Sequence, residues 1–144
     1  MDNKGVFSTD LIISTLMVII ITTGIMHMAS ERMDIAHNFD KLTKTRQLSE
    51  KIASTINKVD ASPGQGIYIK MPDTLANSSN YMVSVNSSGV FIMIDGLKGK
   101  SAIYPIIISN GVNEGPVLMY PGKTYLIQNN PGKTKIIFIN EIKS

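Results

Sequence analysis

The chain has no cysteine, so its 144 residues form neither disulfide bonds nor thiolate metal sites. The two histidines, His27 and His37, both lie in the N-terminal third, and a zinc site is therefore not expected. The acidic residues of the C-terminal part are scattered along the sequence, and no nucleophile stands beside a base in a catalytic pattern. We therefore expect no metal, no cofactor and no enzymatic activity.

Charge is not concentrated in any patch of the sequence. The net charge of +3 comes from 14 Lys and Arg against 11 Asp and Glu spread along the chain. Without an arginine-rich stripe or a row of aromatic residues, a nucleic-acid partner is not expected.

Gly-Lys-Thr occurs twice, within residues 121–124 and 131–134, but the phosphate-loop pattern around it is incomplete. A phosphate-binding loop needs a further glycine five residues before the second one, where this chain has Val117 and Ile127. The Pro-Gly pairs in these segments predict type II turns instead.

Formal charge is absent altogether from Leu11 to Ser30, a run of 20 mostly apolar residues. A helix of that length reaches about 30 Å, which is the thickness of the hydrocarbon core of a bilayer. Because the run is apolar on every side, it does not fit a helix with one face in water. The sequence therefore predicts a membrane-spanning segment at residues 11–30.

Two ordinary fates of such a segment leave residues unexplained. A cleaved secretory signal fits poorly, because the run is long and the small-residue site near Ala29 has His27 three positions before the cut. A permanent anchor with Lys4 held inside explains the hydrophobicity but not Asp10. A carboxylate at the edge of a spanning helix is unfavourable unless it is paired or lies at the interface.

Cleavage between Gly5 and Val6 accounts for more of the sequence. The new amine on Val6 and the carboxylate of Asp10 would be four residues apart, on one face of a helix. An acid in the first turn is also favoured by the helix dipole. In a packed filament, Asp10 could neutralise the amine of a neighbouring helix, as a buried charge requires.

The segment Lys4-Gly5-Val6-Phe7-Ser8-Thr9-Asp10, followed by the apolar run, resembles the class III signal peptide of archaeal type IV pilin-like proteins. Gly5 before the cut, Ser8 and Asp10 carry the resemblance. The family commonly has Gln where this chain has Val6 and Glu where it has Asp10. Asp10 keeps the negative charge on a shorter side chain. The resemblance implies removal of residues 1–5 by a prepilin-type peptidase and bundling of the helices into a filament core.

A single helix is expected to continue from about Ser8 to about Val59, because no proline or glycine occurs between Ile25 and Ser62. Its second half is amphipathic, and we expect its apolar stripe to pack on the C-terminal domain. The stripe slips between Leu42 and Leu48, which disfavours a regular coiled coil. Its members are Met28, Ile35, Phe39, Leu42, Leu48, Ile52, Ile56 and Val59.

Beyond a Pro-Gly-Gln-Gly turn the pattern is that of β-strands separated by turns. Strands are expected at residues 67–71, 81–85, 90–94, 102–108, 117–120, 124–128 and 134–139. The strand at 102–108 contains Pro105, which places it at a sheet edge or a bulge. The layout of residues 49–96 is also similar to the small β-domain of archaeal pilin-like proteins. Asn77 and Asn86 fit the N-glycosylation pattern in predicted turns.

The predicted fold is α+β: a long N-terminal helix, membrane-spanning in its first half and amphipathic in its second, packed on a small mainly antiparallel β-sheet domain. The expected organisation is a leader of residues 1–5, a helix of residues 6–60, and an extracellular β domain of residues 61–144.

The resemblance implies a structural subunit of a type IV-like surface filament, with a possible role in adhesion. Its partners would be other copies or other pilins through the helix, the peptidase, and the membrane before assembly. The alternatives are an uncleaved single-pass anchor carrying an extracellular binding domain, and a minor pilin of a secretion or uptake machine.

Overall fold

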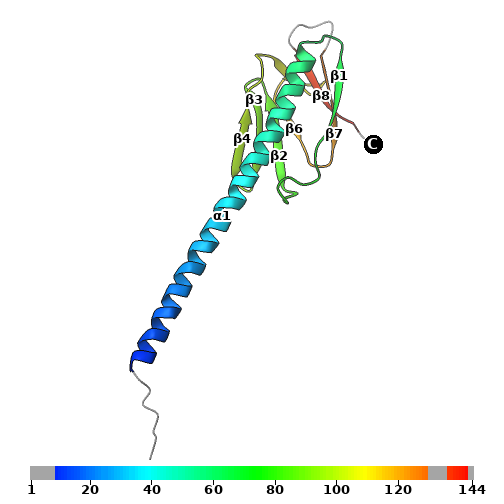
Figure 1. Cartoon of the computed structure of the whole chain (residues 1–144). Helices are drawn as coiled ribbons and strands as arrows, with labels where there is room; N and C mark the ends of the chain where they lie inside the picture. Colours follow the sequence, from blue (N-terminus) through cyan, green and yellow to red (C-terminus); the bar gives the residue numbers. More distant parts are fainter. Residues whose placement is uncertain (1–8, 130–135, 143–144) are drawn as a thin grey trace, which may run out of the picture. The chain divides into compact units, whose positions relative to one another are not determined.

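The computed structural model describes residues 9–129 and 136–142, and the chain divides into two compact units, Met1–Asn38 and Phe39–Ser144. One helix and eight strands make up the described part (Figure 1). They are α1 (Thr9–Asp60), β1 (Gly66–Lys70), β2 (Tyr81–Asn86), β3 (Gly89–Ile94), β4 (Leu97–Ser101), β5 (Ile107–Ser109), β6 (Val117–Met119), β7 (Thr124–Asn129) and β8 (Ile136–Ile142).

The 52-residue helix α1 confirms the prediction of one long helix. An acid, Asp10, lies in its first turn and a base, Lys58, in its last, and both positions complement the helix dipole. The helix ends where proline and glycine follow. There Gln65 N–H donates to the carbonyl of Ser62 at 3.1 Å, and Gly64 has a φ of 81°, which is a type II turn.

The strands form two four-stranded sheets. The first has the order β1-β7-β8-β5 and the second the order β4-β3-β2-β6. Among the described pairs, β5 and β8 run parallel and the others antiparallel, which confirms a mainly antiparallel α+β fold. As Pro105 indicated, β5 lies at a sheet edge.

The expected strand at residues 102–108 was wrong in its bounds, because most of it is loop. The chain instead forms β4 at Leu97–Ser101 and then the short β5 at Ile107–Ser109. Asp95 and Gly96 have φ of 46° and 81°, the two left-handed positions of a tight hairpin turn, so β4 must return along β3. The β4 segment Leu-Lys-Gly-Lys-Ser has weak β propensity, and tertiary pairing at a sheet edge overrides it.

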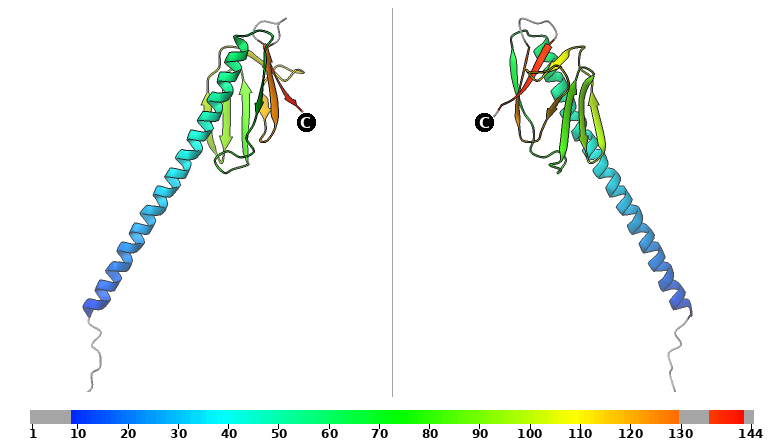
Figure 2. Two further views of the ribbon diagram at one scale, coloured as in Figure 1. Left: turned by 45° about the vertical axis from the view of Figure 1, so that its right-hand side comes forward. Right: turned by 180° about the vertical axis from the view of Figure 1, so that it is seen from behind.

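A single apolar core holds the second unit together. One face of each sheet is buried by the alternation of β-strand side chains, clearest in β2 and β7. The end of α1 lies alongside the sheets (Figures 1 and 2) and adds Ile52 and Ile56, both fully buried. Removing each of these side chains from water stabilises the fold by about 1.5–3 kcal/mol.

The apolar stripe of α1 does not pack on the β-domain along its whole length, contrary to expectation. Within the second unit, Leu48 is 9% exposed, whereas Phe39 is 70% and Leu42 is 41% exposed. The six residues from Leu42 to Leu48 rotate a helix by about 600°, so the two residues lie about 120° apart around the axis. The slip seen in the sequence is therefore a change from one helix face to another.

Small side chains allow α1 to approach β4 closely. A Cβ on Gly99 would lie 2.5 Å from Cγ2 of Thr45, which leaves no room for a larger residue. One turn further along α1, the hydroxyls of Ser49 and Ser101 share a hydrogen bond of 2.9 Å. This contact places the edge strand β4 directly beside the helix.

Candidate assembly site

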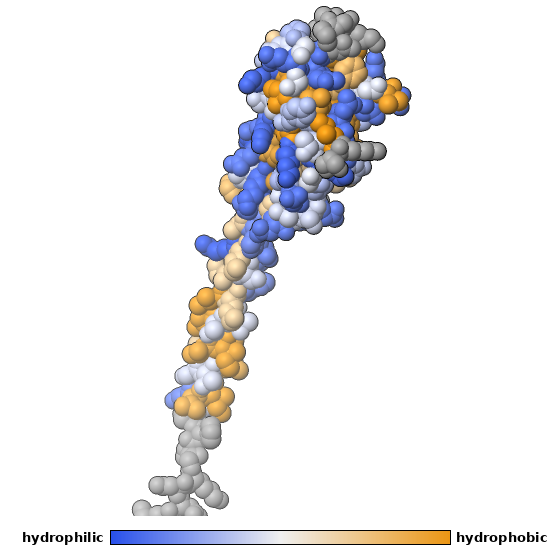
Figure 3. Space-filling view, turned by 90° about the vertical axis from the view of Figure 1, so that its right-hand side faces the viewer, coloured by the Kyte–Doolittle hydropathy of each residue, from blue (hydrophilic) through white to orange (hydrophobic). Residues whose placement is uncertain are grey.

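The first half of α1 is apolar on all its faces. Its large apolar side chains between Leu11 and Met28 are each at least half exposed in the single chain (Figure 3). The helix is long and apolar enough to cross a membrane. A helix with such a surface could lie in lipid or pack against other apolar helices.

The three threonines within this run are hydrogen-bonded to the helix backbone. The hydroxyls of Thr15, Thr22 and Thr23 each donate to the carbonyl four residues earlier, at 2.7, 2.7 and 2.8 Å. Such back-bonded hydroxyls present little unsatisfied polarity to hydrocarbon. Gly24 has open space where a Cβ would stand, so a neighbouring helix could approach it closely.

Asp10 lies exposed in the first turn of α1, next to the start of the apolar run. This is the helix position that the sequence predicts for it. The processing residues Lys4, Gly5, Val6 and Ser8 lie outside the described residues, so the pairing of Asp10 with an amine on Val6 stays a prediction.

Exposed apolar side chains continue beyond the uncharged run. Ile35, Phe39 and Leu42 are 68%, 70% and 41% exposed, although charged residues surround them in the sequence. Met28, Ile35, Phe39 and Leu42 are seven, four and three residues apart, which is the spacing of one helix face. These four residues are called the outer stripe below.

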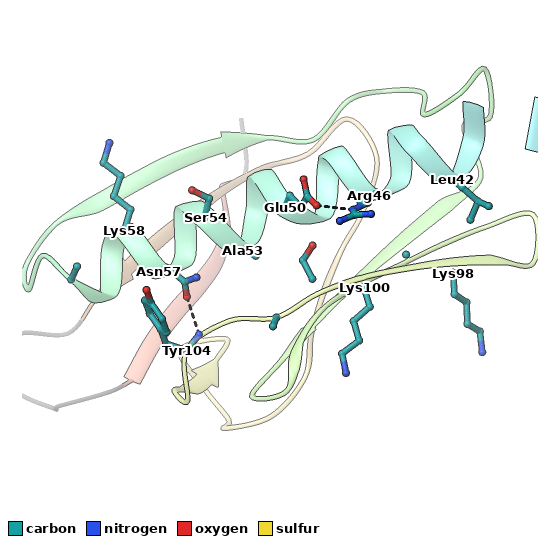
Figure 4. A pocket seen from close by; sticks show the side chains of 14 residues that line it. Leu42, Arg46, Glu50, Ala53, Ser54, Asn57, Lys58, Lys98, Lys100 and Tyr104 are labelled. Atoms are coloured by element: carbon teal, nitrogen blue, oxygen red, sulfur yellow. Dashed lines mark hydrogen bonds and ion pairs between the residues drawn. The ribbon is translucent and has the colours of Figure 1, made fainter. Parts of the chain in front are cut away.

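A groove runs between the end of α1 and the edge strand β4 (Figure 4), with a volume of about 1050 Å³. Its lining includes small residues, among them Ala53, Gly99 and Ala102. Tyr104 closes one end, where its backbone N–H donates to Oδ1 of Asn57 at 3.0 Å. The full lining is Leu42, Arg46, Glu50, Ala53, Ser54, Asn57, Lys58, Ala61, Lys98, Gly99, Lys100, Ser101, Ala102 and Tyr104.

The groove carries more positive than negative charge. On the α1 side of the groove, Nε of Arg46 lies 2.8 Å from Oε1 of Glu50. On the other side, Lys98 and Lys100 extend from β4 away from the helix (Figure 4). Lys100 also lies 5.2 Å from the ring centre of Phe91, a cation–π contact. The charged residues of the lining are therefore Arg46, Lys58, Lys98 and Lys100 with one carboxylate, Glu50.

A smaller apolar hollow of about 190 Å³ lies on the outer face of the second sheet. Met82 and Met93 are directly opposite each other on β2 and β3 and are 42% and 45% exposed. Phe91 and Lys98 complete its two ends. Flexible methionines make this a second surface that could accept an apolar partner.

The two glycosylation candidates lie in separate turns of the second unit. Asn77 is exposed, with a φ of 64°, in the turn that joins Leu75 and Ser78. Asn86 is half-buried at the end of β2, and its Oδ1 accepts a hydrogen bond from Ser88 N–H at 2.8 Å. Asn77 is therefore the more accessible of the two amides.

Two buried tyrosines hold loops against the core. The Tyr81 hydroxyl donates to the carbonyl of Pro72 at 2.5 Å. Burial, aided by the nearby carboxylate of Asp73, raises the pKa of Tyr81 to about 12. Tyr125 accepts a hydrogen bond from Tyr120 N–H at 2.8 Å, and burial raises the pKa of its hydroxyl although this bond lowers it.

Within residues 9–129 and 136–142, no three His, Asp or Glu side chains gather closely enough to hold a metal ion.

The first Gly-Lys-Thr segment lies at a turn in which Gly122 has a φ of 72° and Lys123 N–H points to the carbonyl of Tyr120 at 3.5 Å. That geometry fits the predicted type II turn. The second such segment, at residues 131–134, lies outside the described residues.

Comparison with known protein families, with curated proteins and with solved structures found no match to this chain.

Sequence reasoning did not find the groove. It depends on β4, which the sequence pattern missed, and on Gly99, which has no signature of its own. Asp95-Gly96 is a typical turn dipeptide, and two strands joined by such a pair form a hairpin. That signal, applied to the residues after Gly96, would have placed β4.

Proposed function

We propose that this protein is a pilin-like structural subunit, processed after Gly5 and assembled through α1 into a filament on the cell surface. The observation that carries the proposal is the position of Asp10, an exposed acid in the first turn of a helix whose next 20 residues bear no formal charge. Cleavage after Gly5 would create an amine four residues before this carboxylate, and such a pair offsets two charges in an apolar bundle.

The surfaces of the chain support the same proposal. The first half of α1 is apolar all round, so it can exchange lipid neighbours for the helices of other subunits. The second unit has its own core and would lie outside the bundle, where it could make contacts for adhesion. We place the chain in the cell membrane before assembly and in an extracellular filament afterwards.

The first test is the mass of the protein extracted from membranes. Loss of residues 1–5 is the expected result, because the prepilin-type peptidase cuts the Gly5–Val6 bond. An intact leader would instead favour an uncleaved single-pass anchor with an extracellular binding domain. Electron microscopy of sheared surface material then separates a major filament subunit from a minor pilin.

The second test addresses Asp10 directly. Asp10→Ala should leave membrane insertion unchanged and abolish or strongly reduce filaments, because the amine of the neighbouring helix loses its partner. Asp10→Glu keeps the charge on a longer arm and is the matched control, which should still assemble. Normal filaments from the alanine variant would remove the role assigned to this carboxylate.

A further inference from the structure

We infer that the groove between α1 and β4 binds residues 28–39 of the helix of a second copy of this chain. This inference rests on the proposed function and specifies one contact within the assembly. The partner helix would place the outer stripe residues Ile35 and Phe39 against the groove.

The outer stripe needs a partner that lipid does not provide. Ile35 and Phe39 follow the uncharged run by several residues, at a level where Glu31, Arg32 and Asp34 require water or polar neighbours. Yet both apolar side chains are more than two-thirds exposed. A protein groove lined by both small apolar and charged residues matches such a mixed segment, whereas a bilayer core does not.

The shape of the groove fits a helix. Small residues are part of its lining, including Ala53 from α1 and Ala102 after β4. Small residues on the receiving surface leave space for large side chains such as Ile35 and Phe39. The hollow of Met82 and Met93 is several times smaller and receives fewer side chains.

Charge favours the same pairing. On the α1 side the groove has Arg46 and Lys58 against Glu50, a formal charge of +1, and the Lys98 and Lys100 side chains extend from β4 away from the helix. Residues 28–39 contain Glu31 and Asp34 against Arg32, a formal charge of −1. Opposite signs across an interface favour the correct register and oppose a groove-to-groove contact.

The contact is between two different surfaces, so each copy can offer a helix segment and receive one. Heterologous contacts of this kind continue from copy to copy and give a ring or an open helical filament. A filament is the outcome that agrees with the proposed function.

Disulfide trapping can test this contact cleanly, because the chain has no cysteine of its own. Two differently tagged full-length chains are co-expressed, one with Ile35→Cys and the other with Ala102→Cys. After mild oxidation, the mixed dimer is measured on a non-reducing gel, both in membranes and in sheared filaments. Neither chain carries both cysteines, so every mixed dimer reports a contact between copies.

Matched controls come from the same surfaces. Met33→Cys replaces Ile35→Cys on the donor chain, because positions two apart do not share a helix face. Met93→Cys and Val112→Cys replace Ala102→Cys on the receiving chain, and both native side chains are exposed outside the groove. The expected result is a several-fold greater yield for the 35–102 pair than for any control pair.

Assembled filaments in which a control pair forms as readily as the 35–102 pair would overturn this inference and leave the proposed function standing. An intact leader with neither filaments nor mixed dimers would overturn both. The two failures are therefore distinguished by the filaments themselves.

Discussion

Gly99 determines how closely α1 can lie to β4. A Cβ at this position would stand 2.5 Å from Cγ2 of Thr45, within the well-packed contact between the helix and the sheet. Gly99→Ala should therefore destabilise the second unit by about 1–3 kcal/mol through overpacking. The measurement is chemical unfolding of the detergent-solubilised chain, followed by near-ultraviolet circular dichroism of the tyrosines.

The matched control removes Cγ2 of Thr45, the methyl group with which the new Cβ of Gly99→Ala would clash. Thr45→Ser keeps the hydroxyl that bonds the carbonyl of Lys41 at 2.6 Å but deletes Cγ2. In the double variant, much of the loss caused by Gly99→Ala should be recovered. Strictly additive losses would show that Thr45 is not the limiting contact.

Tyr81 links stability to alkaline pH. Its pKa is raised from 10.0 to about 12 in the folded protein, so the folded state holds the hydroxyl proton more tightly than the unfolded chain does. The stabilisation that comes from this raised pKa is fully present below pH 10. It is lost as the pH rises through about 12, because the tyrosine ionises in the unfolded chain before it ionises in the folded protein. We expect stability to fall over that range.

Tyr81→Phe should cost about 1 kcal/mol near neutral pH, since the hydrogen bond to the carbonyl of Pro72 is lost. It should also make the alkaline decline shallower in unfolding curves measured at several pH values. Tyr68→Phe is the control, because Tyr68 is 66% exposed and gains no such burial. An unchanged alkaline slope in the Tyr81 variant would contradict the assignment.

Within the second unit, the helix α1 has one face that is buried in the core and one face that is exposed. Ile52 is fully buried in the core, whereas Phe39 is 70% exposed. Ile52→Ala should lower the free energy of unfolding by about 2–5 kcal/mol. Phe39→Ala should change it by no more than about 0.5 kcal/mol.

The same pair of variants separates folding from assembly. Phe39→Ala should reduce filament yield while the β-domain unfolds as in the unaltered chain, since the side chain belongs to the outer stripe. Ile52→Ala should reduce both the filament yield and the stability of the β-domain, because the groove depends on the core beneath it. A large loss of stability in Phe39→Ala would place this residue in the core after all.

On the scale of the whole molecule, the β-domain has a core that needs nothing from the first unit. Every residue of the buried apolar cluster in the described chain lies between Leu48 and Ile139. A chain of residues 39–144 should therefore fold by itself, remain in solution without detergent, and unfold cooperatively. An unfolded or aggregated fragment in far- and near-ultraviolet circular dichroism would contradict this expectation.

Local signals predicted most of the elements. The absence of proline and glycine between Ile25 and Ser62 predicted one helix, and the structure has it at Thr9–Asp60. Alternating apolar residues predicted β2, β3, β6 and β7 close to their observed bounds. The strand β4 was missed because Lys-Gly-Lys has little β propensity, and only its pairing with β3 makes it a strand.

Only part of the candidate site could be predicted from the sequence. Asp10 and the uncharged run could be located from the sequence, because charge and hydrophobicity along one helix are local properties. The groove could not, since it joins α1 to residues some fifty positions later, as the Ser49–Ser101 bond illustrates. Contacts at that separation depend on the packing of the sheets and leave no periodic pattern in the sequence.

The sequence by itself determined that this chain has one long helix, a 20-residue run able to cross a membrane, an acid at its start and a set of β-strands. Only the tertiary structure decided which face of that helix is buried and which is left exposed. The physical reason is that Leu42 and Leu48 are equally apolar, and their exposure, 41% against 9%, depends on where the sheets pack.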